Sequence, residues 1–91
     1  MLKSAPPVAV VEVPNEGLVA LLDKEVMVFC ANYIYAGVLA GINETYLKLE
    51  KAKIVYETGP FDTKGYKDAQ ALPGGVWYIQ YTAVESFGPG K

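Results

Sequence analysis

Few side chains of this 91-residue sequence are suited to covalent or metal chemistry. There is no histidine, and Cys30 is the only cysteine, so a histidine-dependent triad, a structural zinc site and a disulfide within the chain are excluded. Glu50, Glu57 and Asp62 do not form a spaced pair suited to general acid and base catalysis. We therefore expect neither enzyme activity nor a cofactor, and we interpret Cys30 as a core residue.

The charges argue against duplex DNA as a partner. All eight basic residues are lysines, and ten acidic residues give a net charge of −2. Without arginine, bidentate recognition of phosphate or guanine is absent, and an acidic chain neutralises few phosphates. Lys48, Lys51 and Lys53 fall within six residues, and we expect them on a solvated surface.

Tyrosine and amide side chains remain as candidate binding groups. Tyrosine rings stack on nucleic-acid bases without charge, and Asn or Gln can recognise a base edge. The alternative is that the seven tyrosines mainly fill a core edge or a subunit interface. Both interpretations stay open at this point.

Length and hydropathy indicate one small domain. Apolar residues make up 52% of the chain, which is high for a lone domain of this size and favours burial against a copy or partner. No apolar run reaches the roughly 18 residues of a membrane span, and prolines interrupt the first 14 residues where a signal peptide would be apolar. We expect a soluble, cytoplasmic protein with no membrane partner.

The elements follow from local patterns. Residues 1–14 predict a loose arm or an extra edge strand, and "EGLVALLD" (16–23) predicts a two-turn helix, with a strand as the alternative. "EVMVFC" (25–30) and "YIYAGVLAGI" (33–42) are typical of strands, and Gly37 and Gly41 predict that the second one bends. The stretch 57–75, with four glycines and two prolines, predicts a long loop in which "KDAQAL" could form one helical turn. "VWYIQYTAVESFG" (76–88) predicts two short strands that meet near residues 80–82.

The segment after the 43–45 turn changes phase. Its apolar positions are 47 and 49, then 52, 54 and 56, so a three-residue step separates Leu49 from Ala52. One extra residue of this kind predicts a β-bulge, which would turn the strand around a small barrel. The alternative is an ordinary hairpin with an imperfect pattern.

This arrangement resembles the Sm-like (LSm) family over roughly residues 15–88, and the ending "AVESFGP" is similar to that of its bacterial Hfq branch. The residues that match the family's two motifs are Val26, Val28, Gly37, Leu39, Asn43, Leu47, Leu49, Ile79 and Val84. The resemblance implies a mainly β fold, a small five-stranded, strongly bent open barrel with a short N-terminal helix. It places residues 15–91 in one Sm-like domain with a variable loop at about 57–75, and gives Gly37, Leu39 and Gly41 structural roles.

The resemblance also implies a function. Asn43, Tyr46, Gln80 and Tyr81 occupy the turns with which RNA-binding members contact a base at the inner rim of a ring. The match is incomplete, because Asn43 stands where the family has an aspartate, and Gln80 and Tyr81 replace its arginine–glycine pair. The implied function is weak binding of single-stranded RNA, and the alternative is a protein-only scaffold or adaptor ring that has lost RNA binding.

The last segment is the expected subunit interface. In the family, the fourth strand of one subunit pairs with the fifth strand of the next, and here "VWYIQYTAVESF" holds a single charge, Glu85, and no proline. An edge of this kind needs a partner, since unpaired apolar strands aggregate. We expect a closed homo-oligomer of roughly five to seven copies. Its interface residues would be Trp77, Ile79, Tyr81, Val84 and Phe87.

Overall fold

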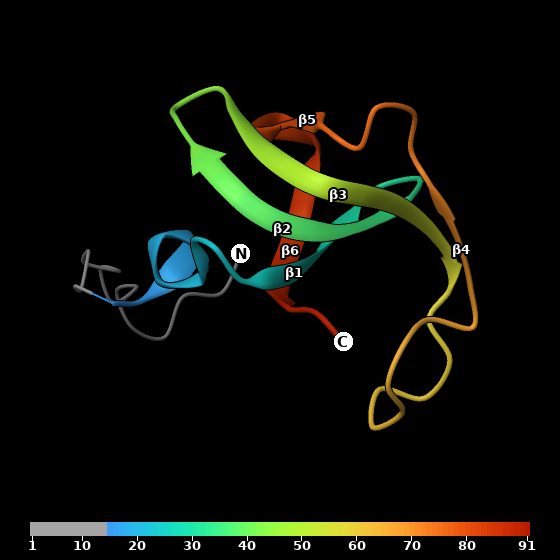
Figure 1. The fold of residues 1–91 in the computed structure, drawn as a ribbon. Coiled ribbons are helices and arrows are strands. Elements are labelled where there is room, and N and C mark those ends of the chain that lie inside the picture. The colour runs from blue at the N-terminus through green and yellow to red at the C-terminus, as the bar shows by residue number, and fades with distance from the viewer. Residues whose placement is uncertain (1–14) are drawn as a thin grey trace, which may run out of the picture.

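The computed structural model describes residues 15–91, which form six antiparallel strands and two short 3₁₀ turns (Figure 1). The strands are β1 (Glu25–Cys30), β2 (Ile34–Ile42), β3 (Tyr46–Glu57), β4 (Asp68–Ala71), β5 (Trp77–Gln80) and β6 (Val84–Pro89). The 3₁₀ turns are η1 (Gly17–Leu21) and η2 (Tyr81–Ala83). The arm predicted for residues 1–14 lies outside the described residues.

The sheet is organised around β3, its longest strand with 12 residues. The first half of β3 pairs with β5, from Tyr46↔Gln80 to Leu49↔Trp77, and its second half pairs with β4. On the other edge β2, β1 and β6 follow in order. Within residues 15–91, β5 and β6 do not pair with each other, so the sheet is open and shows no closure into a barrel.

The N-terminal helix predicted for residues 16–23 is not formed, because η1 is a 3₁₀ turn of five residues. Only Leu18 in it is buried, so the segment lacks the apolar face that would stabilise a helix. The residues that follow η1 are hydrogen-bonded to β2. Asp23 N–H donates to Leu39 O at 2.7 Å, and Leu39 N–H donates to Lys24 O at 3.0 Å. These bonds hold the backbone of residues 23–24 beside β2.

The sheet has one strand more than expected. Residues 68–71, for which the sequence predicts a loop or a helical turn, form β4 and pair with β3 from Lys53↔Ala71 to Glu57↔Asp68. All four residues of β4 are exposed, so no apolar alternation marks the strand in the sequence. Its stability comes from backbone pairing with the part of β3 that extends beyond β5.

The predicted bulge in β3 is confirmed. Ala36 pairs with Lys53 while Val38 pairs with Glu50, so β3 holds one residue more than β2 between these pairs. Lys51 lies in the left-handed region with φ 50°, a conformation typical of bulges and turns. The extra residue keeps both Leu49 and Ala52 buried, at 0% and 1% exposure.

The two glycines of β2 differ in their surroundings. A Cβ at Gly37 would lie 2.8 Å from the backbone oxygen of Glu50 and 3.2 Å from Ala52 Cα, whereas one at Gly41 would only meet Lys48 Cβ at 3.7 Å. β3 therefore approaches Gly37 too closely for any side chain. Gly41 has room for one.

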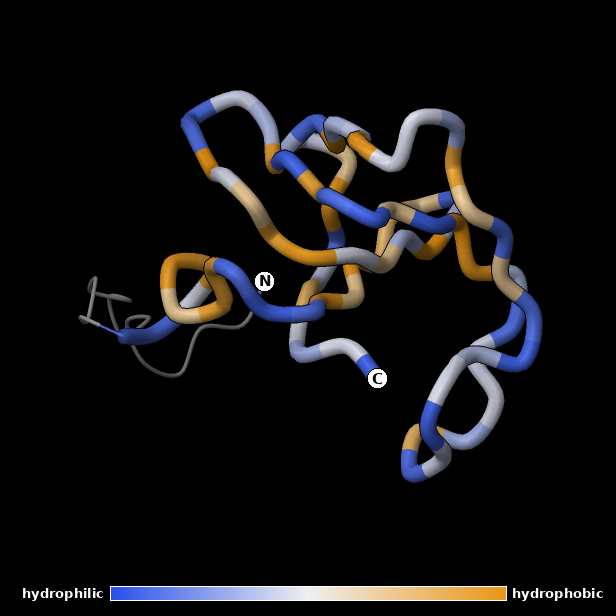
Figure 2. Tube along the Cα trace, in the orientation of Figure 1, coloured by the Kyte–Doolittle hydropathy of each residue, from blue (hydrophilic) through white to orange (hydrophobic). Residues whose placement is uncertain are grey.

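The main core is one cluster of buried side chains from η1, β1, β2, β3 and β5. Its buried side chains are Leu18, Val26, Val28, Leu39, Leu47, Leu49, Ala52 and Ile79. Figure 2 shows the alternation of apolar and polar residues along the strands and the mainly hydrophilic loop between β3 and β4. No helix formed by residues 15–91 has the length and apolar character needed to cross a membrane.

Candidate nucleic-acid interface

The turn between β2 and β3 is held by Asn43. Its side-chain Oδ1 accepts hydrogen bonds from the backbone N–H groups of Thr45 at 2.7 Å and Tyr46 at 2.9 Å, and its own N–H donates to Tyr46 O at 3.1 Å. This is the Asx-turn geometry, in which the side chain replaces a backbone acceptor. The amide oxygen is therefore engaged by the turn, and the Nδ2 amide group is the part of Asn43 left for a ligand.

The turn between β5 and η2 lies beside the turn between β2 and β3. Gln80 ends β5 directly opposite Tyr46, and Tyr81, the first residue of η2, donates its N–H to Thr45 O at 2.9 Å. The structure thus brings together the four residues that the sequence predicts for RNA binding. They come from elements separated by more than thirty positions in the chain.

A fifth residue, Tyr78, belongs to the same surface, which we call the tyrosine cluster: Asn43, Tyr46, Tyr78, Gln80 and Tyr81. The rings of Tyr46 and Tyr78 lie 5.2 Å apart between centroids at an interplanar angle of 83°, the edge-to-face geometry that aromatic pairs favour. Tyr78 is 54% exposed, and Tyr46 and Tyr81 are each 38% exposed. The period-two alternation of "WYIQ", which places Tyr78 and Gln80 on one face, was the signal in the sequence for Tyr78.

A pocket of about 250 Å³ continues this aromatic surface along β5. Tyr78 and Gln80 line it together with Trp77, with Tyr33 from the turn between β1 and β2, and with Tyr35 near the start of β2. The rings of Tyr33 and Tyr35 meet edge to face at 6.3 Å and 61°. Burial is the main cause that raises the pKa of Tyr35, so its hydroxyl stays protonated as a neutral donor.

The residues predicted for a subunit interface differ in their exposure. Tyr81 and Phe87 are each 38% exposed, and Trp77 and Val84 are half-buried against the core. Ile79 is 4% exposed and belongs to the core, so its side chain is buried within the subunit. The physical reason is that Ile79 lies opposite Leu47 on the inward face of β5.

Cys30 lies at the end of β1 and is half-buried. It lines the same pocket as Tyr78 and packs against the core. Burial raises the pKa of its thiol, and the negative charge of Glu85 raises it further. The thiol is therefore held in its neutral, poorly nucleophilic form.

The chemistry of this region is stacking and neutral hydrogen bonding. Among residues 15–91, no group of three or more His, Cys, Asp or Glu side chains is arranged to hold a metal ion. Comparisons of the chain with family models, curated proteins and solved structures gave no match. The candidate site is therefore defined by its own geometry.

Proposed function

We propose that this protein forms a closed homo-oligomeric ring of the Sm-like type and binds single-stranded RNA weakly through the tyrosine cluster. The observation that carries the proposal is the hydrogen bond from Tyr81 N–H to Thr45 O. Together with the Tyr46↔Gln80 pair, it joins two distant turns into one exposed patch of tyrosine and amide side chains.

Two strand edges that have no partner within residues 15–91 support assembly. In the described part of the chain, β5 pairs only with β3, and β6 pairs only with β1. The other edge of each strand offers unpaired backbone groups, which proteins cover or pair. Pairing β5 of one copy with β6 of the next would satisfy both edges, and this head-to-tail contact closes into a ring when the rotation per subunit divides a full turn. Five to seven copies remain the expected size.

The cluster suits bases better than phosphates. Each base stacked on an aromatic ring contributes roughly 1–3 kcal/mol to single-strand binding, and Tyr46, Tyr78 and Tyr81 are exposed enough to take part. Lys48, which lies across from Tyr78 in the β3–β5 pair, is the cation paired directly with this surface. RNA affinity should therefore depend only weakly on salt, with a log–log slope of roughly −0.7 per lysine engaged.

The second candidate is a ring that serves only as a protein scaffold or adaptor. Asn43 Oδ1 is already engaged by two backbone donors, and Tyr46 and Tyr78 pack against each other. Both observations are expected of side chains that stabilise the fold and need no ligand.

The oligomer and the RNA site are tested together. Light scattering coupled to size exclusion should give a monodisperse oligomer of roughly five to seven copies. Fluorescence anisotropy with short homopolymer RNAs at two salt concentrations should then show weak binding that Tyr46→Ala abolishes while the oligomer stays intact. Tyr56→Ala is the matched control, because Tyr56 is also exposed, at 53%, and lies at the far end of the same strand.

The outcomes separate the candidates. A monodisperse monomer near 10 kDa would refute both ring proposals. A ring without RNA binding would leave the scaffold function. RNA binding that Tyr46→Ala and Tyr56→Ala weaken equally would remove the tyrosine cluster from the site.

A further inference from the structure

A second surface of different character lies at the other end of β3, where β3 leads into the loop of residues 58–67 (Figure 1). An open pocket of about 680 Å³ lies there, lined by residues of β3, of this loop, of β4 and of the segment after β6. The volume lies in the range of small-molecule sites. In β4 the pocket is bordered by Asp68, Ala69 and Ala71.

The pocket concentrates positive charge in an acidic protein. Five of the eight lysines line it: Lys51, Lys53, Lys64, Lys67 and Lys91. Glu25 and Asp68 are the acidic residues of the lining, so five positive and two negative charges give a local net charge of +3. The whole chain carries −2.

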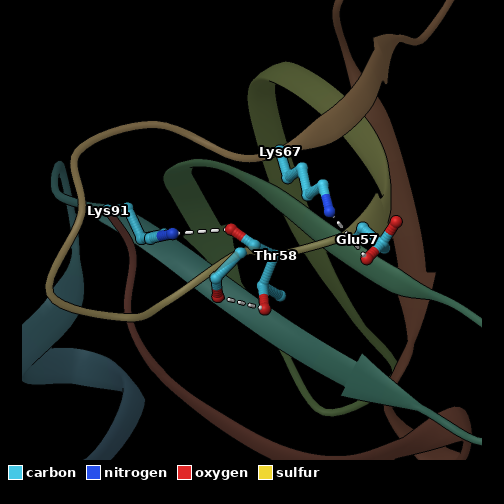
Figure 3. Close-up of polar contacts among 5 residues, drawn as sticks. Glu57, Thr58, Lys67 and Lys91 are labelled. Carbon is cyan, nitrogen blue, oxygen red and sulfur yellow. Dashed lines mark hydrogen bonds and ion pairs between the residues drawn. The ribbon is translucent and has the colours of Figure 1, made fainter.

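The protein itself neutralises little of this charge. Lys67 Nζ lies 3.7 Å from Glu57 Oε2, and both side chains are mainly exposed, at 67% and 63% (Figure 3). Such a surface pair contributes at most about 1 kcal/mol. Lys91 Nζ donates to the backbone oxygen of Thr58 at 2.6 Å (Figure 3), which positions the ammonium group without cancelling its charge. An anionic ligand would offset the mutual repulsion that remains.

Several local structures hold the lysines in place. The bulge turns β3 so that Lys51 and Lys53 line the pocket on either side of the buried Ala52. Ala52 is fixed through its backbone, since its N–H donates to Gly75 O and its oxygen accepts from Leu72 N–H, both at 2.9 Å. The backbone that carries Lys51 and Lys53 is therefore held by hydrogen bonds on both sides of Ala52.

The loop and the end of the chain meet at Tyr66. Lys67 N–H and Lys91 Nζ both donate to Thr58 O, at 3.3 and 2.6 Å, which closes the base of the loop. Lys53 Nζ and Lys91 Nζ lie 5.4 and 5.6 Å from the centroid of the Tyr66 ring, within cation–π distance. The tyrosine thus holds two lysines from different elements beside the pocket.

Glu25 offers an acceptor to a hydrogen-bond donor on a ligand, beside the Tyr66 hydroxyl, whose pKa is raised by burial and further by Glu25. Its Oε2 atom is buried and has no hydrogen-bond partner among residues 15–91. A buried carboxylate oxygen without a partner is costly. A ligand that carries both an anionic group and an N–H or O–H donor would satisfy the lysines and Glu25 together.

We propose that this lysine pocket binds a small phosphate-bearing ligand of nucleotide size, with its phosphates on Lys51, Lys53 and the loop lysines and a donor group on Glu25. The site is independent of the tyrosine cluster and of ring assembly. Its chemistry is electrostatic, whereas that of the tyrosine cluster is stacking.

The test uses ADP, pyrophosphate and inorganic phosphate as probes of the full chain in isothermal titration calorimetry. ADP should bind best, and its affinity should fall as salt rises. Replacing both Lys51 and Lys53 by Glu should weaken ADP binding by at least about tenfold, because two charge-assisted contacts are lost. Lys48→Glu is the matched control and should leave ADP affinity unchanged, since Lys48 is on the same strand but does not line the pocket.

Two further variants keep the result decisive. If circular dichroism shows that the double variant is unfolded, Lys64→Glu in the exposed loop replaces it, with a severalfold loss of affinity expected. Glu25→Gln should weaken the binding of ADP more than that of pyrophosphate, because only ADP carries hydroxyl and amino donors outside its phosphate groups. The proposal is overturned if ADP does not bind at millimolar concentration, or if Lys48→Glu weakens it as much as the pocket variants. Tyr46→Ala should not change ADP affinity, so failure here and failure of the RNA proposal are distinguishable.

Discussion

Gly37 offers the sharpest test of the strand packing, because β3 crosses it with no room for a side chain. A Cβ at this position would lie 2.8 Å from Glu50 O, and ordinary contact begins at 3.4 Å. The strands would therefore have to separate by about 0.6 Å at the bulge, the difference between these two distances. The obstructing atom is backbone, so it cannot move away by rotating a side chain.

We expect Gly37→Ala to lower the free energy of unfolding by roughly 1–3 kcal/mol, the usual cost of overpacking. For a domain of this size, the melting temperature should fall by roughly 5–20 °C. Gly37→Val should be worse, because its branched side chain needs more space on the same side. Thermal unfolding followed by circular dichroism measures the change, with all variants at one protein concentration, since the proposed assembly would couple stability to concentration.

Gly41→Ala is the matched control in the same strand. Its added methyl group would meet only Lys48 Cβ, at an ordinary 3.7 Å. Alanine is favoured over glycine inside a strand by roughly 0.5–1 kcal/mol, so this variant should be as stable as the parent or slightly more stable. Equal melting temperatures for the Gly37→Ala and Gly41→Ala variants would refute the close approach of β3 to Gly37.

Two smaller predictions concern the turn and the thiol. Asn43→Ala removes the acceptor of two backbone N–H groups. It should lower the free energy of unfolding by about 1 kcal/mol and the melting temperature by roughly 4–8 °C. Asn32→Ala, in another exposed turn, is the control and should have little effect. Alkylation of Cys30 by iodoacetamide should have a midpoint pH above that of an ordinary thiol, because burial and Glu85 raise its pKa, and Glu85→Gln should move that midpoint down. A midpoint that Glu85→Gln leaves unchanged would contradict the role of Glu85, and equal losses in the two asparagine variants would contradict the role of the Asx turn.

Local patterns in the sequence predicted most of the sheet. The alternation in residues 25–30, the three-residue step between Leu49 and Ala52, and the final pair of strands all report side-chain burial, which is visible along the chain. The sequence did not predict β4, because its four residues are all exposed and the strand is formed by backbone pairing alone. The helix was over-predicted because Gly17, with φ 72°, and the bonds to Leu39 outweighed a short apolar run.

The two proposed binding surfaces also differ in how far the sequence predicts them. The tyrosine cluster was largely predicted because the resemblance to the Sm-like family points to its two turns. The lysine pocket was not, since Lys64, Lys67 and Lys91 meet Lys51 and Lys53 only through the loop closure at Thr58. No spacing along the chain shows that contact.

The pairing of β1 with β6 has a consequence for synthesis on the ribosome. Val26 pairs with Pro89, so β1 is made long before its partner strand exists. At roughly 5–20 residues per second, the interval is roughly 3–13 s. During it, the hairpin of β2 and β3 can form by local contacts, while one edge of β1 stays unpaired beside Val26 and Val28, which are fully buried in the finished fold. The nascent chain therefore presents an apolar strand edge for seconds, and edges of this kind are where incompletely folded chains associate.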